Sequence, residues 1–476
     1  MSAARYEMVV GLEVHVQLRT RTKAFCRCST SFGEAPNRNT CPVCLALPGA
    51  LPVLNERAVE LATRAALALG LTVHERSVFA RKNYFYPDLP KGYQISQFDR
   101  PLAERGSLAI GGGRTIGITR IHMEEDAGKS VHDRFAGFTA IDLNRSGVPL
   151  IEIVSEPEIR GSAEAGAYLR ALKEILLYAD VSDCSMEEGS LRVDANVSAR
   201  AAGEQAYRTR TEIKNLNSFS NVERALEFEF ARHCAAYDAG SAVVQQTMLF
   251  DAHKNEVRAA RSKEESHDYR YFPEPDLPPL VLVPAWIQGV KYGLPEFPAA
   301  RRARYTSAYA LSALDADVLT ASRAVGDYFE RVASAAGDAK AAANWVMGEV
   351  LASLNETDGD IAAFPVPAHA LGELIALVKQ GALSNSAAKT VFATLLSEGG
   401  SAAAIAERDG LLQVGDDSAL IAWIDAVWAE HPGEAARFAG GERKLQGVLV
   451  GFVMKKSKGR ADPRKVNQLL GERAGT

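Results

Sequence analysis

Hydrophobic and polar residues alternate along the segment from Val9 to Leu18. One set of alternate positions is aliphatic, and the other set carries Glu13, His15 and Gln17. A period of two is the pattern of a β-strand with one dry and one polar side. Taken alone, the polar side is equally well explained as a solvated face.

The same alternation returns in three later segments, residues 115–125, 191–198 and 209–214. Their polar positions carry charged, imidazole and amide side chains: Arg120, His122 and Glu124; Arg192, Asp194, Asn196 and Ser198; Arg210, Glu212 and Lys214. Residues 148–154 instead form a continuous apolar run that is interrupted only by Glu152. Burying an unpaired carboxylate costs several kcal/mol, so Glu152 must be paired, protonated or bound to a metal, unless its strand is half exposed.

Together these segments predict a curved, mainly antiparallel sheet whose polar face is rich in carboxylates. Oxygen ligands favour Mg²⁺, which is normally shared with the phosphates of a substrate. We predict that Lys214, Arg210 and Arg192 neutralise such phosphates. Gly128 and Lys129 resemble the end of a phosphate-binding loop, but Met123 occupies the position of its first glycine, so a contact of Lys129 with phosphate is only a hypothesis.

Four of the six cysteines form two close pairs, Cys26 with Cys28 and Cys41 with Cys44. Two thiol pairs across a short loop can converge on one tetrahedral Zn²⁺, and without an open position that ion is structural. Free thiols or a redox pair are the alternatives.

The loops 80–97 and 258–276 interleave basic and aromatic residues, which suits either stacking on a nucleotide or RNA end, or simple aromatic packing.

After about residue 293 the pattern becomes helical and rich in alanine. We expect helices at 299–311, 316–336, 340–354 and 368–380, and a break at Gly399-Gly400. The predicted fold is therefore α+β: a cradle domain at 1–293, an all-α domain at 294–405 and a small helical tail domain at 406–476.

Residues 441–476 carry nine basic and three acidic residues, a net charge of +6. This charge predicts RNA contacts, or else a merely solvated helix, for Lys455, Lys456, Lys458, Arg460 and Lys465.

The composition of the chain further limits the class of protein to which it can belong. The 476 residues are 47% hydrophobic and 24% charged, with a net charge of −5, as in ordinary globular proteins. No run approaches the roughly 20 apolar residues of a membrane span, and the first residues lead directly into a strand pattern without a signal peptide. The cytoplasm is the expected compartment.

Several long motifs carry a resemblance to a known family. They are Gly11–Leu18, Ile121–Lys129, Leu143–Pro157, Leu191–Ser198, His267–Leu277, Ala343–Leu351 and Asn467–Leu470. They resemble the B subunit of the aspartyl/glutamyl-tRNA(Asn/Gln) amidotransferase. The resemblance implies a heterotrimer that also contains the amidase (A) and the small (C) subunits. It further implies use of ATP and Mg²⁺ to phosphorylate Glu or Asp misacylated on tRNA(Gln) or tRNA(Asn), before ammonia from the amidase displaces the phosphate.

The resemblance also implies site residues. By motif, the metal-binding set corresponds to Glu13, His15, Glu124 or Glu125, Glu152 and Asp194, with a further acid from Glu264 or Glu265. We predict that Glu152, Glu124, Lys214 and Arg210 act in catalysis, and that Lys129, Arg192, Asn196 and Glu212 contact the nucleotide. Glu13, His15, Glu125, Asp194 and Glu264 are the predicted Mg²⁺ ligands. The rival interpretation is a non-catalytic tRNA-binding scaffold.

Overall fold

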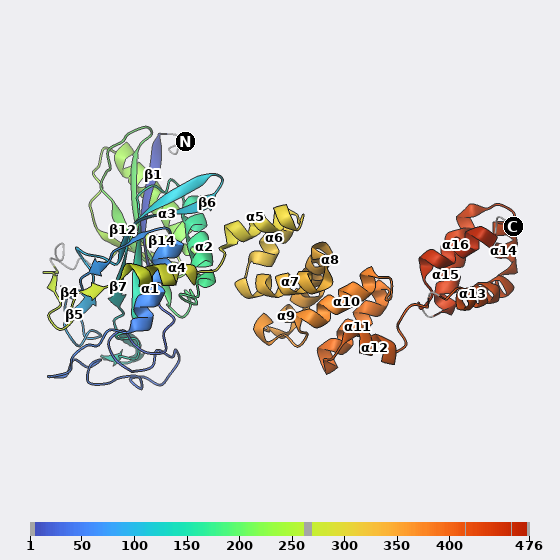
Figure 1. Ribbon diagram of the computed structural model, residues 1–476. Helices are drawn as coiled ribbons and strands as arrows, with labels where there is room; N and C mark the ends of the chain where they lie inside the picture. Colours follow the sequence, from blue (N-terminus) through green and yellow to red (C-terminus); the bar gives the residue numbers. More distant parts are fainter. Residues whose placement is uncertain (1–4, 261–268, 415, 458, 474–476) are drawn as a thin grey trace. The chain divides into compact units, whose positions relative to one another are not determined.

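The computed structural model describes residues 5–260, 269–414, 416–457 and 459–473. The chain divides into two compact units, residues 1–297 and 298–476 (Figure 1). The first unit combines a large sheet with helices and the second is helical, so the predicted α+β class is confirmed. None of the described helices is both long and apolar enough to cross a membrane.

A nine-stranded sheet, counted over the described residues, organises the first unit. Its strand order is β14-β13-β12-β11-β1-β10-β7-β6-β2. All neighbours pair antiparallel except β12 and β13, so the predicted mainly antiparallel sheet is confirmed. The strands are β1 (Tyr6–Gln17), β2 (Thr72–Val73), β6 (Ala103–Gly111), β7 (Arg114–Glu125), β10 (Pro149–Ser155), β11 (Leu191–Ala201), β12 (Thr211–Leu216), β13 (Thr247–Asp251) and β14 (Glu256–Ala259).

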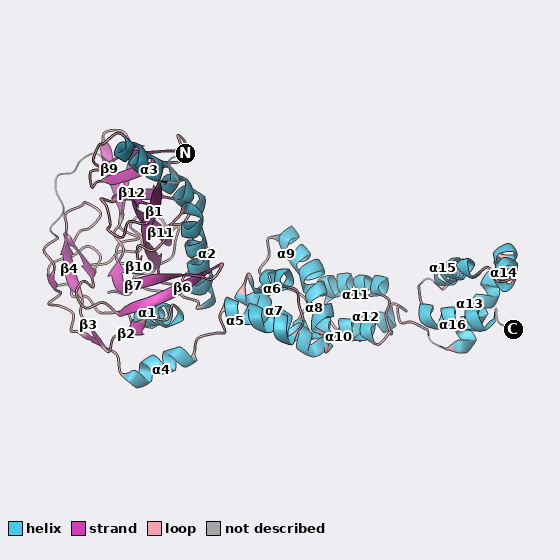
Figure 2. Cartoon of the chain, turned by 90° about the horizontal axis from the view of Figure 1, so that it is seen from above, coloured by secondary structure: helices cyan, strands magenta, loops and turns pink. Residues whose placement is uncertain are grey.

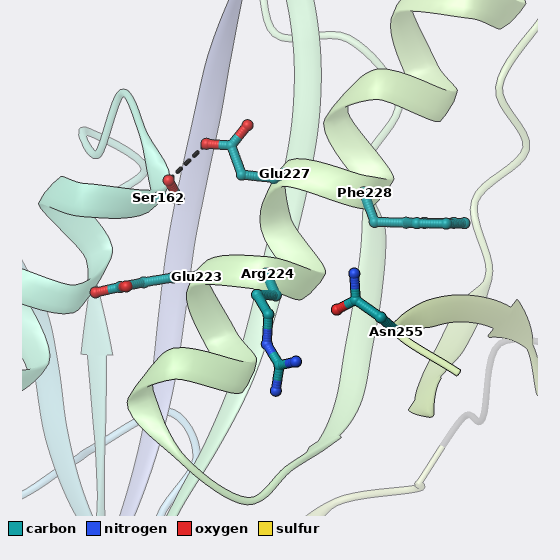
Figure 3. Close-up of a pocket in the computed structure, with 6 residues that line it drawn as sticks. All are labelled: Ser162, Glu223, Arg224, Glu227, Phe228 and Asn255. Carbon is teal, nitrogen blue, oxygen red and sulfur yellow. Dashed lines mark hydrogen bonds between the residues drawn. The ribbon is translucent and has the colours of Figure 1, made fainter. Parts of the chain in front are cut away.

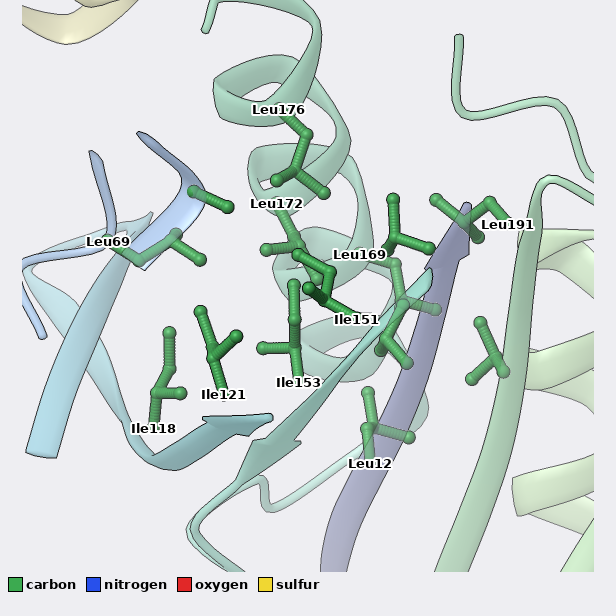
Figure 4. Packing of buried hydrophobic residues seen from close by; sticks show 14 of the residues in the cluster. Leu12, Leu69, Ile118, Ile121, Ile151, Ile153, Leu169, Leu172, Leu176 and Leu191 are labelled. Atoms are coloured by element: carbon green, nitrogen blue, oxygen red, sulfur yellow. The ribbon is translucent and has the colours of Figure 1, made fainter. Parts of the chain in front are cut away.

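Three helices cover the dry face of this sheet: α1 (Glu56–Ala68), α2 (Ser162–Tyr178) and α3 (Phe219–Asp238). Aliphatic side chains from β1, β7 and β10 pack against Leu169, Leu172 and Leu176 of α2 (Figure 4). The Asn55 side chain accepts hydrogen bonds from the backbone N–H groups of Arg57 and Ala58 and is therefore the N-cap of α1. Because side chains alternate along each strand, burying one set leaves the polar set on the opposite face.

Small sheets and one more helix complete the first unit. A three-stranded sheet contains β15 (Phe272–Pro273), β4 (Ala80–Asn83) and β5 (Tyr93–Ser96), in that order. Two pairs remain, β8 (Lys129–Phe135) with β9 (Phe138–Asp142), and β16 (Leu280–Val281) with β3 (Arg76–Ser77). The helix α4 (Pro284–Tyr292) precedes the end of the unit.

The second unit holds two separate hydrophobic clusters, one from Tyr305 to Ala406 and one from Leu420 to Leu470. The helices that carry these residues are labelled in Figure 2. Ala406, which belongs to the first cluster, lies just beyond the predicted boundary after residue 405, within the helix at residues 402–408. The first group of helices is α5 (Pro298–Ala308), α6 (Ala313–Thr320), α7 (Arg323–Ala336), α8 (Ala339–Trp345), α9 (Leu351–Thr357), α10 (Ala368–Lys379), α11 (Asn385–Glu398) and α12 (Ala402–Arg408). The second group is α13 (Asp417–Glu430), α14 (Pro432–Ala439), α15 (Gln446–Lys456) and α16 (Pro463–Arg473).

Two helices that the sequence predicts as continuous in this unit are interrupted in the structure. The helix expected at 316–336 is split into α6 and α7, with Ser322 in an extended conformation between them. The buried Arg301 of α5 donates a hydrogen bond to the carbonyl of Arg323 (3.3 Å) at this break, a tertiary contact that leaves no local sequence signal. The helix expected at 340–354 is interrupted by a π-helical turn, Val346–Val350.

Candidate functional site

The polar residues of neighbouring strands lie side by side because of the strand register. Glu152 of β10 pairs with His15 of β1 on one side and with His122 of β7 on the other. Glu13 of β1 pairs with Asp194 of β11. Directly opposed residues of an antiparallel pair project from the same face with Cβ atoms about 5 Å apart. The separate polar faces inferred from the sequence therefore form one continuous surface.

The centre of this surface is the carboxylate cluster, defined here as His15, Glu124 and Glu152. One ligand-type atom of each lies within 4.8 Å of the other two. Glu152 Oε2 lies 3.4 Å from Nε2 of His15 and 3.3 Å from Nε2 of His122. His122 Nε2 is also 3.3 Å from Glu124 Oε1, so His122 bridges the two carboxylates.

Strand β5 supplies further hydrogen bonds to the buried Glu124. The Ser96 hydroxyl donates to Glu124 Oε1 (2.7 Å), and the Gln94 amide donates to Oε2 (2.9 Å). These contacts place the small β15-β4-β5 sheet over the polar face of the large sheet. Glu124 and Glu152 are 4% and 8% exposed, so both carboxylates have left bulk water and need these partners.

The histidines keep both carboxylates ionised. Burial works to raise the pKa of Glu124, but the hydrogen bond with His122 and the charge of Lys82 outweigh burial and lower it to about 2. The pKa of Glu152 also falls well below its usual value, because His122 and His15 outweigh burial. Burial lowers the pKa of His122, yet its hydrogen bonds to Glu124 and Glu152 raise it to about 9. Glu124 and Glu152 are thus buried anions that the side chains of His15 and His122 stabilise.

A second acidic cluster, Glu13, Asp194 and Glu212, also brings three carboxylate oxygens within 4.8 Å of one another. Here the counter-charge is Lys214, whose Nζ lies 2.9 Å from both Asp194 Oδ2 and Glu212 Oε1. Asn196 donates to Glu13 Oε1 (3.1 Å). Burial, followed by the charge of Glu152, raises the pKa of Glu13. An ammonium group therefore already offsets part of the negative charge of this second cluster.

Four other predicted residues, Glu125, Arg192, Lys129 and Arg210, belong to neither cluster. Glu125 faces the opposite way from Glu124, pairs with Lys91 and accepts a hydrogen bond from the backbone of Ile95 (3.0 Å). Arg192 is paired with the buried Asp126 (3.0 Å). The predicted phosphate contacts Lys129, at the start of β8, and Arg210, just before β12, are exposed and join neither cluster. Glu264 and Glu265 lie outside the described residues.

Sequence reasoning left three important neighbours out of the predicted site: His122, Gln94 and Ser96. A signal for His122 was present, because the alternation along β7 puts His122 and Glu124 on one side and Glu125 on the other. No comparable signal marks Gln94 and Ser96, because they reach Glu124 from another sheet.

The four cysteines of the predicted zinc knuckle form a compact thiol cluster, Cys26, Cys28, Cys41 and Cys44, with all sulfurs within 4.8 Å of one another. The Sγ atom of Cys44 lies 3.6 Å from that of Cys26 and 3.8 Å from that of Cys41. Four sulfurs placed tetrahedrally at about 2.3 Å from one Zn²⁺ would lie about 3.8 Å apart. The hydrogen bond from Cys26, and then the charge of Lys23, lower the pKa of Cys44 to about 4. The spacing of the sulfur atoms fits zinc.

The described basic residues predicted to contact RNA in the tail are all exposed, and two of them are paired with acids. Lys456 pairs with Glu430, and Lys465 Nζ lies 3.4 Å from Asp417, both acids of α13. Lys455 and Arg460 are exposed, and the Arg460 guanidinium lies 5.8 Å from the ring centroid of Trp423. Lys458 lies outside the described residues. The acids of α13 therefore offset part of the positive charge of residues 441–476.

A shallow cavity of about 400 Å³ lies away from the clusters, between the start of α2, the outer side of α3 and the β13–β14 turn (Figure 3). Its acids already have partners: Glu227 accepts a hydrogen bond from Ser162 Oγ (2.5 Å), and Glu223 pairs with Arg170 (3.1 Å). This cavity is therefore separate from the buried ionic groups of the large sheet.

Comparisons with known proteins agree with the division into a sheet unit and a helical unit. Residues 8–288 match the family model described as the GatB/GatE catalytic domain, and residues 327–473 match the one described as the GatB domain. The chain is 53% identical over 469 residues to the B subunit of the aspartyl/glutamyl-tRNA(Asn/Gln) amidotransferase of Pelodictyon phaeoclathratiforme, covering 98% of both chains. It is 52% identical over 471 residues to the protein of the same name from Geobacter sulfurreducens, again covering 98% of both.

These matches define the class as a component of a tRNA-dependent amidotransferase, a carbon–nitrogen ligase. Within that class, the chain belongs to the family formed by the B subunits of the aspartyl/glutamyl-tRNA(Asn/Gln) amidotransferases. The resemblance inferred from the sequence motifs is confirmed.

Proposed function

We propose that this chain activates the side-chain carboxyl group of Glu or Asp carried on misacylated tRNA(Gln) or tRNA(Asn). The γ-phosphoryl group of ATP passes to a carboxylate oxygen, which gives an acyl phosphate and ADP. Ammonia then attacks the carbonyl carbon, loses a proton, and displaces inorganic phosphate to leave the amide. The observation that carries this proposal is the buried carboxylate cluster on a rigid sheet, in a chain that belongs to a ligase family.

The residues of the carboxylate cluster fit a divalent cation. Two carboxylates and an imidazole converge, and both carboxylates are ionised, as ligands must be. We propose that His15, Glu124 and Glu152 hold Mg²⁺, with Glu13 and Asp194 next to them. Bound Mg²⁺ would neutralise charge on the transferring phosphoryl group. The thiol cluster would hold a structural Zn²⁺.

The finer assignments of partners follow from the same proposal. The ammonia would come from the amidase, which is the A subunit of the complex, and a small C subunit would complete the heterotrimer. The exposed Lys455 and Arg460 of the tail would contact tRNA phosphates. Because aminoacyl-tRNA and ATP are both used in translation, we propose that the complex acts in the cytoplasm.

Replacing Glu152 by Gln in the assembled complex tests the proposal. This change keeps the shape of the side chain and removes its charge, so amidation should fall by about 10²-fold or more, with either glutamine or free ammonia as nitrogen donor. Hydrolysis of glutamine by the amidase and binding of tRNA should persist. Glu75→Gln, at an exposed carboxylate of the same unit, is the matched control.

The scaffold interpretation predicts the opposite result. If Glu152→Gln retains the full amidation rate with ammonia, this chain only presents the tRNA and the activation chemistry lies elsewhere. A loss of tRNA binding in the same variant would also contradict the proposed role, because Glu152 would then support the fold or the RNA interface.

A further inference from the structure

The β15-β4-β5 sheet turns one face toward the carboxylate cluster. Gln94 and Ser96 of β5 lie on that face, because both donate hydrogen bonds to Glu124. In the register of β4 with β5, Lys82 is the partner of Gln94. Partners in an antiparallel pair share a face, so Lys82 also faces the carboxylates. Its pKa supports this placement: burial lowers it, but Glu124 and other nearby groups outweigh burial and raise it.

Four aromatic rings continue this face, and we name them the aromatic wall: Tyr84, Phe98, Tyr269 and Tyr271. The ring centroids of Tyr84 and Tyr269 are 6.1 Å apart, as are those of Tyr269 and Tyr271. Phe98 stacks on Tyr271 at 4.1 Å with an interplanar angle of 8°. The Lys82 ammonium lies 5.2 Å from the ring centroid of Tyr269 and so joins the wall to the ionic site.

The aromatic wall is not part of the hydrophobic core of the first unit. None of its four rings belongs to the buried core cluster or to the partly buried side chains that pack against that cluster. Phe98 keeps 46% of its surface exposed, and the three tyrosines are half-buried. A loop that is only held down by aromatic packing would bury its rings in the core, so the exposed part of the wall can still receive a ligand.

We propose that the aromatic wall is a nucleobase-binding subsite of the carboxylate site. Aromatic side chains bind bases by stacking on their faces, and a nearby cation accompanies the attached phosphate. This inference rests on the proposed function, whose two substrates both carry a base: the adenine of ATP and the terminal nucleobase of the tRNA. Lys82 lies between the wall and the carboxylates, where the phosphate or the aminoacyl ester of either substrate would pass.

Equilibrium binding to the assembled complex tests the subsite. The probes are ATP, inorganic tripolyphosphate, and tRNA transcripts with and without their 3′-terminal base, all with Mg²⁺. Phe98→Leu and Tyr84→Leu should weaken binding of one base-bearing ligand by about 5- to 100-fold, the usual effect of losing one stacking ring. Binding of tripolyphosphate, which has no base, should not change. Phe98→Tyr and Tyr84→Phe keep the rings and should bind as the original chain does.

The two sources of the base are separated by which ligand responds. If ATP binding weakens, the wall binds adenine of the nucleotide. If binding of the intact transcript weakens and that of the transcript without its terminal base does not, the wall binds the RNA end. Phe135→Leu changes another exposed aromatic residue of the same unit and is the matched control.

Unchanged binding of both ATP and intact tRNA in Phe98→Leu and Tyr84→Leu would overturn the inference. An equal loss of tripolyphosphate affinity would also overturn it, because the damage would then be general. If Tyr84→Leu does not fold, the half-exposed Phe98 decides alone. Failure of the proposed function looks different, since it would appear as normal amidation by Glu152→Gln, whatever the ring variants do.

Discussion

The thiol cluster and the carboxylate cluster are assembled in opposite ways. All four thiol ligands lie within residues 26–44, on one irregular loop. His15, Glu152 and Glu124 come from β1, β10 and β7, and they meet only through the strand register. A loop without regular backbone pairing gains order from the metal that it binds, whereas a strand residue is positioned by the sheet before any ligand arrives.

The two clusters also balance their charge differently. In the thiol cluster, the buried Lys23 donates a hydrogen bond to Cys44 Sγ (3.4 Å), and the pKa of Cys44 is lowered. In the carboxylate cluster, His122 lies between two carboxylates. Removing His122 and removing Lys23 should therefore have different consequences. Loss of His122 should destabilise the fold, because the carboxylates that it leaves are buried in the sheet. Loss of Lys23 should mainly weaken metal binding by the thiols.

The largest effect is expected for His122→Leu. Breaking a buried ionic group by removing one partner typically costs about 3–5 kcal/mol, and the remaining hydrogen bonds from Ser96 and Gln94 should keep the loss at the lower end of that range. Chemical unfolding in a chelating buffer measures the change, and added Mg²⁺ should recover much of it. His74→Leu removes a half-exposed His–Glu pair of the same unit and should cost about 1 kcal/mol or less. Equal losses for the two variants would contradict the ionic role of His122.

A smaller effect is expected for Lys23→Met. Groups that support metal ligands typically contribute 10–100-fold to metal affinity, so zinc should bind about 10–100-fold more weakly. Competition with a chromogenic zinc chelator measures this change. Lys129→Met alters an exposed lysine of the same unit and should leave zinc affinity unchanged. Unchanged affinity in Lys23→Met would mean that the lysine serves only its backbone contacts to Asn39 and Leu143.

The smallest effect is expected for Asn55→Ala. This change removes the N-cap of α1 and the hydrogen bonds from Asn55 Nδ2 to the backbone of Thr22 and Lys23, beside the thiol loop. Loss of an N-cap costs about 1 kcal/mol. Ser218→Ala removes the N-cap of α3, which has no link to that loop, and should cost a similar amount. Chemical unfolding compares the two, and a greater loss of zinc affinity in Asn55→Ala would show that α1 positions the thiols.

How far each site could be predicted follows from this contrast. The spacing of the cysteines was enough to predict the thiol cluster, and alternation placed Glu13 and His15 on a polar face. Glu152 was marked instead by its position inside an apolar run. Alternation also separated Glu124 from Glu125, although both remained in the predicted site. It could not reveal that Lys214 is also paired with Asp194, or that Arg192 is paired with Asp126, because these two pairs join different strands or loops.

The sequence by itself determined the five central strands β1, β7, β10, β11 and β12, the thiol spacing and the family, since each depends on residues near one another or on long motifs. The tertiary structure alone decided that His122 bridges Glu124 and Glu152, that β5 donates to Glu124, and that the aromatic wall faces the same carboxylates. The physical reason is register. A shift of one residue between two strands reverses every side chain, and only packing of the whole sheet against α1, α2 and α3 selects one register.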